Sequence, residues 1–412
     1  MTAATVADLT IDRIAAGGDG IARADAVVVF VPRSAPGDWA RIRLDIRKRF
    51  ARGEIEEILL PSPQRVEPAC AHYTVDKCGG CQLQHIGYDA QLQAKQGIIR
   101  DAVTRIAKRN VDLPAIHASD KQWRYRLKLT LAMRQSRDGA WIIGLHPYDD
   151  PGVVFQLQDC PITDDRVIAV WRQIMAAHRY FPMADTLRAS VRLLDDGAAI
   201  VMEGGNAWPD RGAFFQAVAG ATALWWRPVH RARSLVAERN GSSATASFAQ
   251  VNATVGALLH QHVLRRTRSY RPRSVVDAYA GSGATAIPLA HDGIHVVAIE
   301  SDREASARCA AALPAGSRAV GATVEDALQR SLPADVVLIN PPRTGVHARV
   351  AATLQSAADP PRGLIYISCD PATLARDLSR MPRYRVVSME AFDMFPQTAH
   401  VETVCELVPE AA

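Results

Sequence analysis

Cys369 stands where a thiol can act as a nucleophile. It follows the apolar run 363–367 and precedes Asp370 and Pro371, so it lies between an expected buried strand and an expected helix. Proline suits the first position of a helix, and the amino end of a helix favours a thiolate, whereas the carboxylate of Asp370 opposes it. A buried, inert cysteine is the ordinary alternative at such a position.

Asn340 ends a second expected buried strand in the same way. The run 336–339 is uniformly apolar, and two prolines follow Asn340 directly. In α/β sheets, ligands bind at the carboxyl ends of the strands. We therefore expect Asn340 at the ligand-binding edge of the sheet.

A glycine turn follows a third apolar run, which begins at Ser274. It contains Tyr279, Gly281 and Gly283, and Glu300 ends the next apolar run. Glycines let the backbone approach a ligand, and a carboxylate at the next strand end can hold ribose hydroxyls. The turn also satisfies a dinucleotide-binding pattern, so a nicotinamide or flavin enzyme stays open, as does a tight turn without a ligand.

Four of the seven cysteines are spaced like metal ligands. Cys78 and Cys81 are separated by two glycines, Cys70 lies upstream and Cys160 far downstream. Four thiolates can hold zinc or a cubane iron-sulfur cluster, and ligand softness allows both. The odd total does not fit an extracellular disulfide framework. We expect the remaining cysteines besides Cys369 to lie in the core, namely Cys309 and Cys405.

Three units are expected to position these residues. The length of 412 residues suggests two or three domains. Residues 1–60 predict a small β-barrel, 61–240 a central domain with an antiparallel sheet, and 241–412 a doubly wound α/β domain, because strands there alternate with helices.

The first two units contain segments that could contact other molecules. In 41–47, apolar residues alternate with arginines, which predicts a strand whose polar face either tracks RNA or is simply solvated. The run 88–108 predicts an amphipathic helix that packs on the catalytic domain. The apolar positions on which this helix prediction rests are Leu92, Ile99, Val103 and Ile106. In 123–128, aromatic and basic residues interleave, as in nucleobase-stacking segments and in half-buried strands.

Composition narrows the class without choosing a function. The net charge of +5 permits a polyanionic partner but does not require one. There is no uncharged apolar stretch of membrane-spanning length and no secretory signal at Met1–Thr10, so we expect a cytoplasmic protein that does not associate with membranes, and a monomer.

Three motifs resemble those of the 5-methyluridine RNA methyltransferases. They are Asn340–Arg343, Ser368–Asp377 and Phe395–Glu402, in the family's order. Residues 1–60 resemble the TRAM domain of that family, and 248–252 resemble its segment with a cofactor-binding glutamine. Family members often carry aspartate where Asn340 stands, and asparagine where Ala284 and Asp370 stand.

The resemblance implies a class I, S-adenosylmethionine-dependent methyltransferase fold and specific roles. Cys369 would be the nucleophile and Glu402 the base. The implied cofactor contacts are Gln250, Tyr279, Gly281, Glu300, Asp326 and Asn340. The resemblance to one branch of the family also implies a [4Fe-4S] cluster, held by Cys70, Cys78, Cys81 and Cys160. The implied partner is RNA, with large-subunit ribosomal RNA preferred over transfer RNA.

Three other function classes compete with this hypothesis. An amino-group methyltransferase also uses Asn-Pro-Pro, but it needs an aromatic residue where Arg343 stands. A dinucleotide-dependent oxidoreductase with an iron-sulfur centre leaves Cys369 and Glu402 unexplained. A non-enzymatic RNA-binding protein does not need both of these positions filled.

Overall fold

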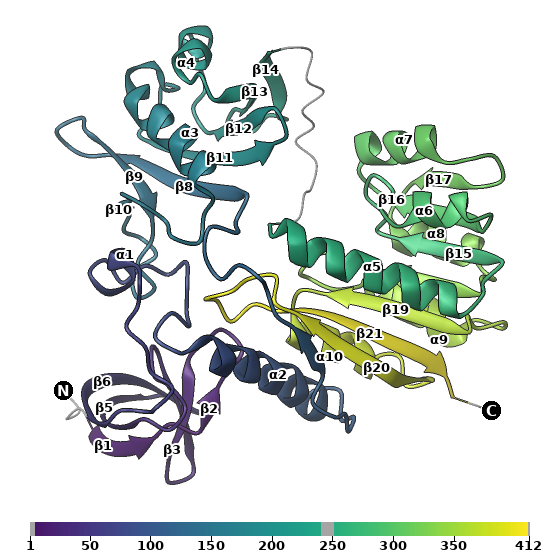
Figure 1. Cartoon of the computed structure of the whole chain (residues 1–412), viewed down its shortest axis with the longest axis horizontal. Helices are drawn as coiled ribbons and strands as arrows, with labels where there is room; N and C mark the ends of the chain where they lie inside the picture. The colour runs from purple at the N-terminus through teal and green to yellow at the C-terminus, as the bar shows by residue number, and fades with distance from the viewer. Residues whose placement is uncertain (1–4, 240–250, 411–412) are drawn as a thin grey trace.

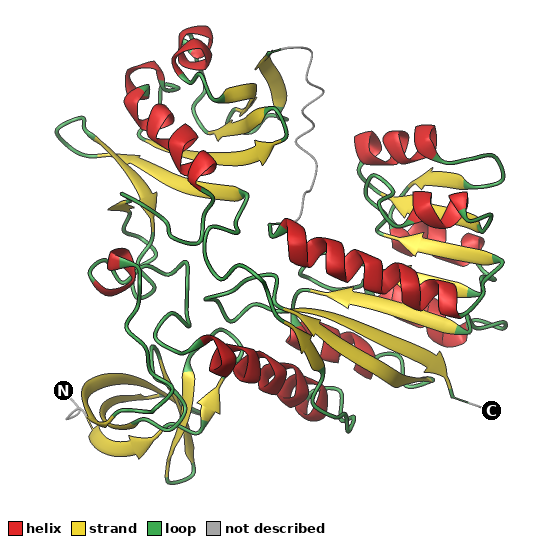
Figure 2. Cartoon of the chain, in the orientation of Figure 1, coloured by secondary structure: helices red, strands yellow, loops and turns green. Residues whose placement is uncertain are grey.

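The computed structural model describes residues 5–239 and 251–410, which form three β-sheets. Figure 1 shows the three sheets in separate parts of the molecule, and Figure 2 shows that helices flank the second and third. No helix in these described ranges has the length and apolar character needed to cross a membrane.

The N-terminal sheet has six strands in the order β1-β5-β6-β4-β3-β2. Its elements are β1 (Thr5–Thr10), β2 (Arg13–Ile14), β3 (Gly20–Ala24), β4 (Val27–Val31), β5 (Trp39–Ile46) and β6 (Ala51–Leu60). The alternation in β5 sends Ile42 and Leu44 into a core with Val29 and Val31.

The arginines on the other face of β5 do not form a free basic surface. Arg41 pairs with Asp8 at 3.0 Å and with Glu57 at 2.9 Å, and Arg43 bonds Glu54. Carboxylates from both neighbouring strands thus neutralise this face, which favours the solvated alternative over phosphate contact.

A connecting segment follows the first sheet. It contains α1 (Ala71–Thr74), α2 (Tyr88–Arg105) and β7 (Ala115–His117). The helix predicted over 88–108 is confirmed for Tyr88–Arg105, and its buried face contains only two of the four predicted apolar positions. Gln91 and Lys95 are buried together with Ile99 and Val103, whereas Ile106 is 44% exposed. The predicted buried face of this helix was therefore partly wrong. Gln91 and Lys95 are buried because their hydrogen-bond partners lie in the C-terminal part of the chain.

The central sheet has seven strands in the order β10-β9-β8-β11-β12-β13-β14. Its strands are β8 (Lys128–Gln135), β9 (Trp141–Leu145), β10 (Phe155–Gln156), β11 (Thr186–Leu194), β12 (Gly197–Glu203), β13 (Ala221–Arg227) and β14 (Ser234–Glu238). Helices α3 (Asp165–Ala176) and α4 (Arg211–Ala217) and a 3-10 turn (His178–Tyr180) accompany it. The sheet is antiparallel except for the β12–β13 pair, which is parallel.

The third sheet has eight strands in the order β17-β16-β15-β18-β19-β21-β20-β7. Its own strands are β15 (Ser274–Ala278), β16 (His295–Glu300), β17 (Arg318–Gly321), β18 (Val336–Ile339), β19 (Gly363–Ser368), β20 (Tyr384–Phe392) and β21 (Glu402–Pro409). Strands β15 to β19 are parallel to their neighbours, and β21 runs antiparallel between β19 and β20. The predicted doubly wound α/β class is confirmed.

Helices cover both faces of this sheet. One core contains side chains of α5 (Ala253–Ser269), α6 (Ala286–His291) and α7 (Arg303–Ala312); the other contains side chains of α8 (Val324–Ser331), α9 (Ala348–Ser356) and α10 (Pro371–Ser379). Helix α2 joins the second group and packs on α10 (Figure 1). The carboxyl ends of the parallel strands therefore meet at one edge of the sheet, and β21 begins at that same edge.

Candidate active site

Sheet pairing places Cys369 and Glu402 across from each other. Cys369 directly follows β19, and Glu402 is the first residue of β21. Because the antiparallel register pairs Ser368 with Thr403, the next position along the ladder sets Cys369 opposite Glu402. Two residues 33 positions apart in sequence therefore share one strand-end site.

The helix after Cys369 begins as the sequence predicted. Asp370 is the N-cap of α10, and its carboxylate accepts a hydrogen bond from the Thr373 amide at 2.7 Å, while Pro371 occupies the first turn. Aspartate and asparagine both cap helices well. The departure from the family's asparagine at this position therefore preserves the cap.

The charges at this site set the proton affinities of both groups. Burial raises the pKa of the Cys369 thiol, and the neighbouring Glu402 raises it further, whereas the guanidinium of Arg343 lowers it. Burial raises the pKa of Glu402 to about 7, and Arg343 again opposes the shift. Sequence reasoning did not select Arg343 as a site residue, although its position directly behind Asn-Pro-Pro at a strand end was a signal for it.

The glycine turn after β15 is built around the Glu300 carboxylate. Oε2 accepts a hydrogen bond from the Gly281 amide at 2.9 Å, and Oε1 accepts one from the Asp302 amide at 2.7 Å. Tyr279 and Gly281 have φ angles of +65° and +56°, a conformation that glycine adopts without cost and other residues rarely adopt. The carboxylate thus has a fixed position at the rim of this turn.

Asp277, which sequence reasoning missed, lies buried beneath the turn. Its Oδ2 atom has no hydrogen-bond partner among the described residues, and burial raises the pKa of the carboxyl to about 7. A buried polar atom without a partner is costly unless a ligand supplies one. A ligand with a ribose and an ammonium group fits these two carboxylates, because Glu300 can accept from hydroxyls and Asp277 from the cation.

The other predicted cofactor residues are placed differently from one another. Tyr279 lines a cleft of about 500 Å³ with Thr323 and Pro342. Asn340 lies exposed at the end of β18, next to β15. Its backbone amide donates a hydrogen bond to the Ala278 carbonyl of β15. The structure does not bring Asp326 to this cleft; its exposed carboxylate bonds Arg349 at 2.9 Å and the Thr323 hydroxyl at 2.8 Å. Gln250 lies outside the described residues.

The structure brings the four clustered cysteines together. Every pair among them is close enough for their charges to interact. The Gly80 amide donates to Cys78 Sγ at 3.4 Å, and the Gln84 side chain hydrogen-bonds Cys81. Burial raises the pKa of Cys78 to about 11, so a bound cation would be needed to hold such thiols as thiolates. Amide donors aimed at sulfur are a usual feature of metal-thiolate sites.

The aromatic and basic segment 123–128 serves this cluster rather than an open surface. Tyr125 is 4% exposed and packs with Cys70 and Cys81, and Arg124 bonds Asp159 at 2.7 Å. Strand β8 begins only at Lys128. The predicted core cysteines Cys309 and Cys405 are both fully buried, as expected.

A separate group of potential metal ligands lies at the edge of the third sheet. His117, His262 and Glu390 place their ligand atoms within 4.8 Å of one another. Both imidazoles approach the same Glu390 oxygen, at 2.6 and 3.3 Å. Attraction to a shared carboxylate accounts for this convergence without a metal ion.

Known proteins match nearly the whole chain, and a family model matches the part that contains the candidate active site. A family model described as tRNA (Uracil-5-)-methyltransferase matches residues 321–408, which include Asn340, Cys369 and Glu402. An uncharacterized RNA methyltransferase of Thermosynechococcus vestitus is 30% identical over 97% of both chains. A 23S rRNA (uracil(1939)-C(5))-methyltransferase of Thiobacillus denitrificans, RlmD, is 30% identical over 94% of this chain and 96% of its own. The chain belongs to the RNA uracil-C5 methyltransferase family.

A solved structure of this methyltransferase family shares the fold. The Pyrococcus abyssi tRNA (uracil-54, C5)-methyltransferase, in complex with S-adenosyl-L-homocysteine, superposes with a TM-score of 0.67 and 22% identity over 97% of this chain and 99% of its own. The predicted class I methyltransferase fold is therefore confirmed. Family membership makes the chain an S-adenosylmethionine-dependent enzyme and excludes a dinucleotide-dependent oxidoreductase as its function class.

Removing the Glu300 carboxylate from this methyltransferase should weaken cofactor binding strongly. Glu300→Ala loses the hydrogen bonds expected to ribose and the bond that holds Gly281, and charge-assisted bonds of this kind contribute about 1.5–3 kcal/mol each. We expect the Kd for S-adenosylhomocysteine to rise by roughly 30- to 1000-fold in isothermal titration calorimetry. Asp326→Ala is the matched control, and we expect it to change the Kd less than threefold. A large effect of Asp326→Ala would return that residue to the cofactor site.

Proposed function

We propose that this enzyme transfers a methyl group from S-adenosylmethionine to carbon 5 of a specific uridine in RNA, through a covalent bond between Cys369 and the uracil ring. The observation that carries this proposal is the β19–β21 register, which sets Cys369 opposite Glu402 at the edge that also carries the glycine turn. In this arrangement Cys369 as nucleophile and Glu402 as base lie at the same sheet edge as the glycine turn that would hold the cofactor.

Cys369 performs the activating step. Carbon 5 of uracil is too weak a nucleophile to take a methyl group by itself, so the Cys369 thiolate adds to carbon 6 and converts the ring into an enolate. Arg343, which favours the thiolate, supports this step. S-adenosylmethionine supplies a methyl group on a sulfonium, which carbon 5 of the enolate accepts.

Glu402 completes the reaction. The methylated ring is saturated and still carries a proton on carbon 5. The Glu402 carboxylate takes that proton, the electron pair re-forms the 5,6 double bond, and the Cys369 thiolate leaves. A general base works best when its pKa lies near the working pH, and burial brings that of Glu402 to about 7.

We propose large-subunit ribosomal RNA as the substrate. This rests on the relative from Thiobacillus denitrificans, which is named for 23S rRNA and aligns along nearly the whole chain. Transfer RNA is the second candidate, since the Pyrococcus abyssi neighbour is named for it. The target uridine must leave its stack to reach Cys369. We expect a monomeric, cytoplasmic enzyme. Its N-terminal, TRAM-like sheet would contact the RNA through a surface other than the neutralised arginine face of β5.

The substrate proposal is tested by methyl transfer to defined RNAs. Purified enzyme is incubated with labelled S-adenosylmethionine and either protein-free 23S rRNA or bulk tRNA from cells that lack the gene, and 5-methyluridine is mapped by mass spectrometry. We expect one labelled uridine in 23S rRNA and none in tRNA. Label in tRNA alone would overturn the ribosomal assignment, and label on a base other than uracil would overturn the chemistry.

We propose that Cys70, Cys78, Cys81 and Cys160 hold a [4Fe-4S] cluster. A single zinc ion, bound at about 2.3 Å from each sulfur, would set the sulfurs about 3.8 Å apart. No three of these sulfurs lie within 4.8 Å of one another, although all four are mutual neighbours. The resemblance to the cluster-bearing branch of the family is what supports a multi-iron centre over zinc. Methyl transfer involves no redox change, so the centre would supply a structural link.

A further inference from the structure

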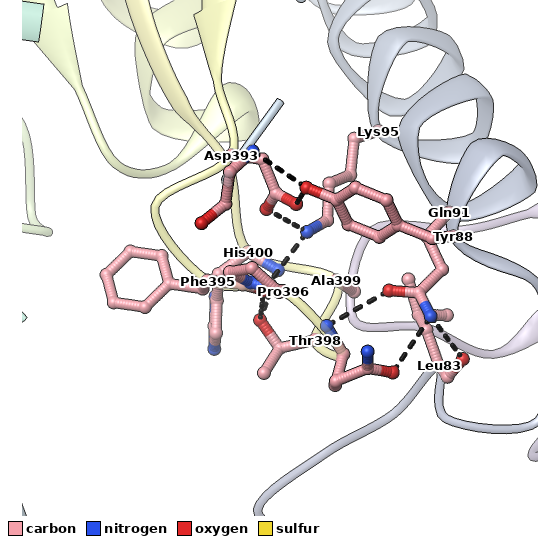
Figure 3. A network of polar contacts seen from close by, with 12 residues as sticks. Leu83, Tyr88, Gln91, Lys95, Asp393, Phe395, Pro396, Thr398, Ala399 and His400 are labelled. Carbon is pink, nitrogen blue, oxygen red and sulfur yellow. Dashed lines mark hydrogen bonds and ion pairs between the residues drawn. The ribbon is translucent and has the colours of Figure 1, made fainter. Parts of the chain in front are cut away.

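The segment that leads into Glu402 is held by residues that precede the methyltransferase domain in sequence. Residues 393–401 connect β20 to β21 and lead directly into Glu402, the first residue of β21. Among the described residues, the hydrogen bonds that reach this segment from elsewhere in the chain all come from 82–125, which precede the catalytic domain in sequence. Figure 3 shows the contacts that come from Tyr88, Gln91 and Lys95 of α2.

The strongest of these contacts is a buried ion pair. Lys95 Nζ lies 2.5 Å from Asp393 Oδ1, and both side chains are completely buried. Lys95 also donates to the Phe395 carbonyl at 3.0 Å, and the Tyr88 hydroxyl donates to Asp393 Oδ2 at 2.8 Å (Figure 3). The same hydroxyl accepts from the Ser119 amide. These hydrogen bonds therefore fix the directions of both Asp393 carboxylate oxygens and of the Phe395 carbonyl.

Burying such a pair gains little stability. The desolvation of two charges offsets most of their attraction, and an apolar pair of similar volume is often as stable or more stable. What an apolar pair cannot do is fix the direction of a loop. The geometry of the segment, rather than its stability, is what Lys95 provides.

A second set of contacts ties the segment to the cysteine loop. Gln91 exchanges two hydrogen bonds with Gln397, at 2.9 and 3.0 Å, and Gln397 has a φ of +70°. The Gln397 carbonyl accepts from the amides of Gln82 and Leu83, directly after Cys81. The strained residue in the middle of the segment is thus held by α2 and by the metal-binding loop together.

We propose that Lys95 is a positioning residue for proton removal: with Tyr88 and Asp393 it holds the 393–401 segment so that the Glu402 carboxylate reaches carbon 5 of the methylated uracil. This inference rests on the proposed function. Addition of Cys369 to the ring does not depend on the segment, because Cys369 is carried by β19 and α10. Loosening the segment therefore slows the breakdown of the covalent intermediate more than its formation.

The test measures intermediate and turnover in the full-length protein with its metal centre. In Lys95→Met we expect kcat to fall about 10- to 100-fold, as for a misplaced catalytic group, with KM for RNA within twofold of wild type. A protein–RNA adduct that survives denaturing electrophoresis should accumulate during turnover. Arg105→Met, on the exposed face of the same helix, should match wild type in all three measurements.

Two further variants separate positioning from folding. Tyr88→Phe removes the two hydrogen bonds of the hydroxyl, to Asp393 and from Ser119, and keeps the ring. We expect it to accumulate adduct in a smaller amount than Lys95→Met, and it provides the test if Lys95→Met fails to fold. Lys95→Met with Asp393→Leu removes both charges; we expect it to recover thermal stability but not kcat. Recovery of both, or a stable Lys95→Met that turns over slowly without adduct, overturns the inference. Absence of methylation in the wild type would instead refute the proposed function.

Discussion

Glu402→Gln is expected to abolish turnover and leave the enzyme covalently bound to its RNA. The amide has nearly the shape of the carboxylate but cannot take the proton from carbon 5, so the Cys369–uracil bond forms and does not break. We expect kcat to fall at least about 10³-fold, which is within the range that a general base contributes, and adduct to approach one RNA per enzyme. Denaturing electrophoresis of labelled RNA measures the adduct, and methyl transfer from labelled S-adenosylmethionine measures kcat.

Cys369→Ala and Glu410→Gln are the controls for this result. Cys369→Ala removes the bonding atom, so neither turnover nor adduct is expected, alone or combined with Glu402→Gln. Glu410→Gln changes an exposed carboxylate just beyond the end of the same strand and should leave activity unchanged. An adduct in the double variant, or wild-type turnover of Cys369→Ala, would show that another residue is the nucleophile.

Cys81→Ser is expected to remove the metal centre and to destabilise the contacts that the cysteine loop makes with residues 393–401. Structural metal sites contribute roughly 10 kcal/mol to folding, and losing a large part of this lowers the midpoint of thermal unfolding by more than about 10 °C. We expect loss of the absorption near 400 nm and of protein-bound iron in anaerobically purified protein. Turnover should also fall, because the Gln82 and Leu83 amides behind Cys81 hold Gln397.

Cys309→Ala is the matched control, since it empties a buried thiol outside the cluster. This variant should keep all of the iron and lose only the small amount of stability that a small core cavity costs. Wild-type protein that carries one zinc ion, no iron and no absorption near 400 nm would contradict the cluster while leaving a four-cysteine metal site. Full iron retention in Cys81→Ser would exclude Cys81 as a ligand.

The local sequence pattern was sufficient to predict the placement of residues that lie at the carboxyl end of a strand. An apolar run followed by a polar residue and a proline predicted the placement of Asn340 and Cys369, because parallel strands present their carboxyl ends at one edge. The glycine turn and Glu300 followed from the same rule. The four cysteines were recognisable because thiolates are common ligands of zinc and of iron-sulfur clusters, and two cysteines separated by two residues have a spacing typical of such sites.

Long-range pairing decided the features that sequence reasoning missed or misplaced. The buried face of α2 follows Lys95 and Gln91, because their partners lie about 300 residues away in sequence. Arg41 and Arg43 form a neutralised surface, because β1 and β6 supply the carboxylates.

The sequence by itself determined the doubly wound fold, because apolar strands alternate with helices from Val251 onward. The nucleophile, the base and the metal ligands were assigned by the resemblance of short motifs to the family, and these assignments stay predictions. Only the tertiary structure decided how these parts meet. It set Cys369 opposite Glu402 through the register of β19 and β21, and it left one oxygen of the buried Asp277 carboxylate, Oδ2, without a hydrogen-bond partner among the described residues. Registers and buried polar partners depend on segments distant in the chain, and no local pattern contains them.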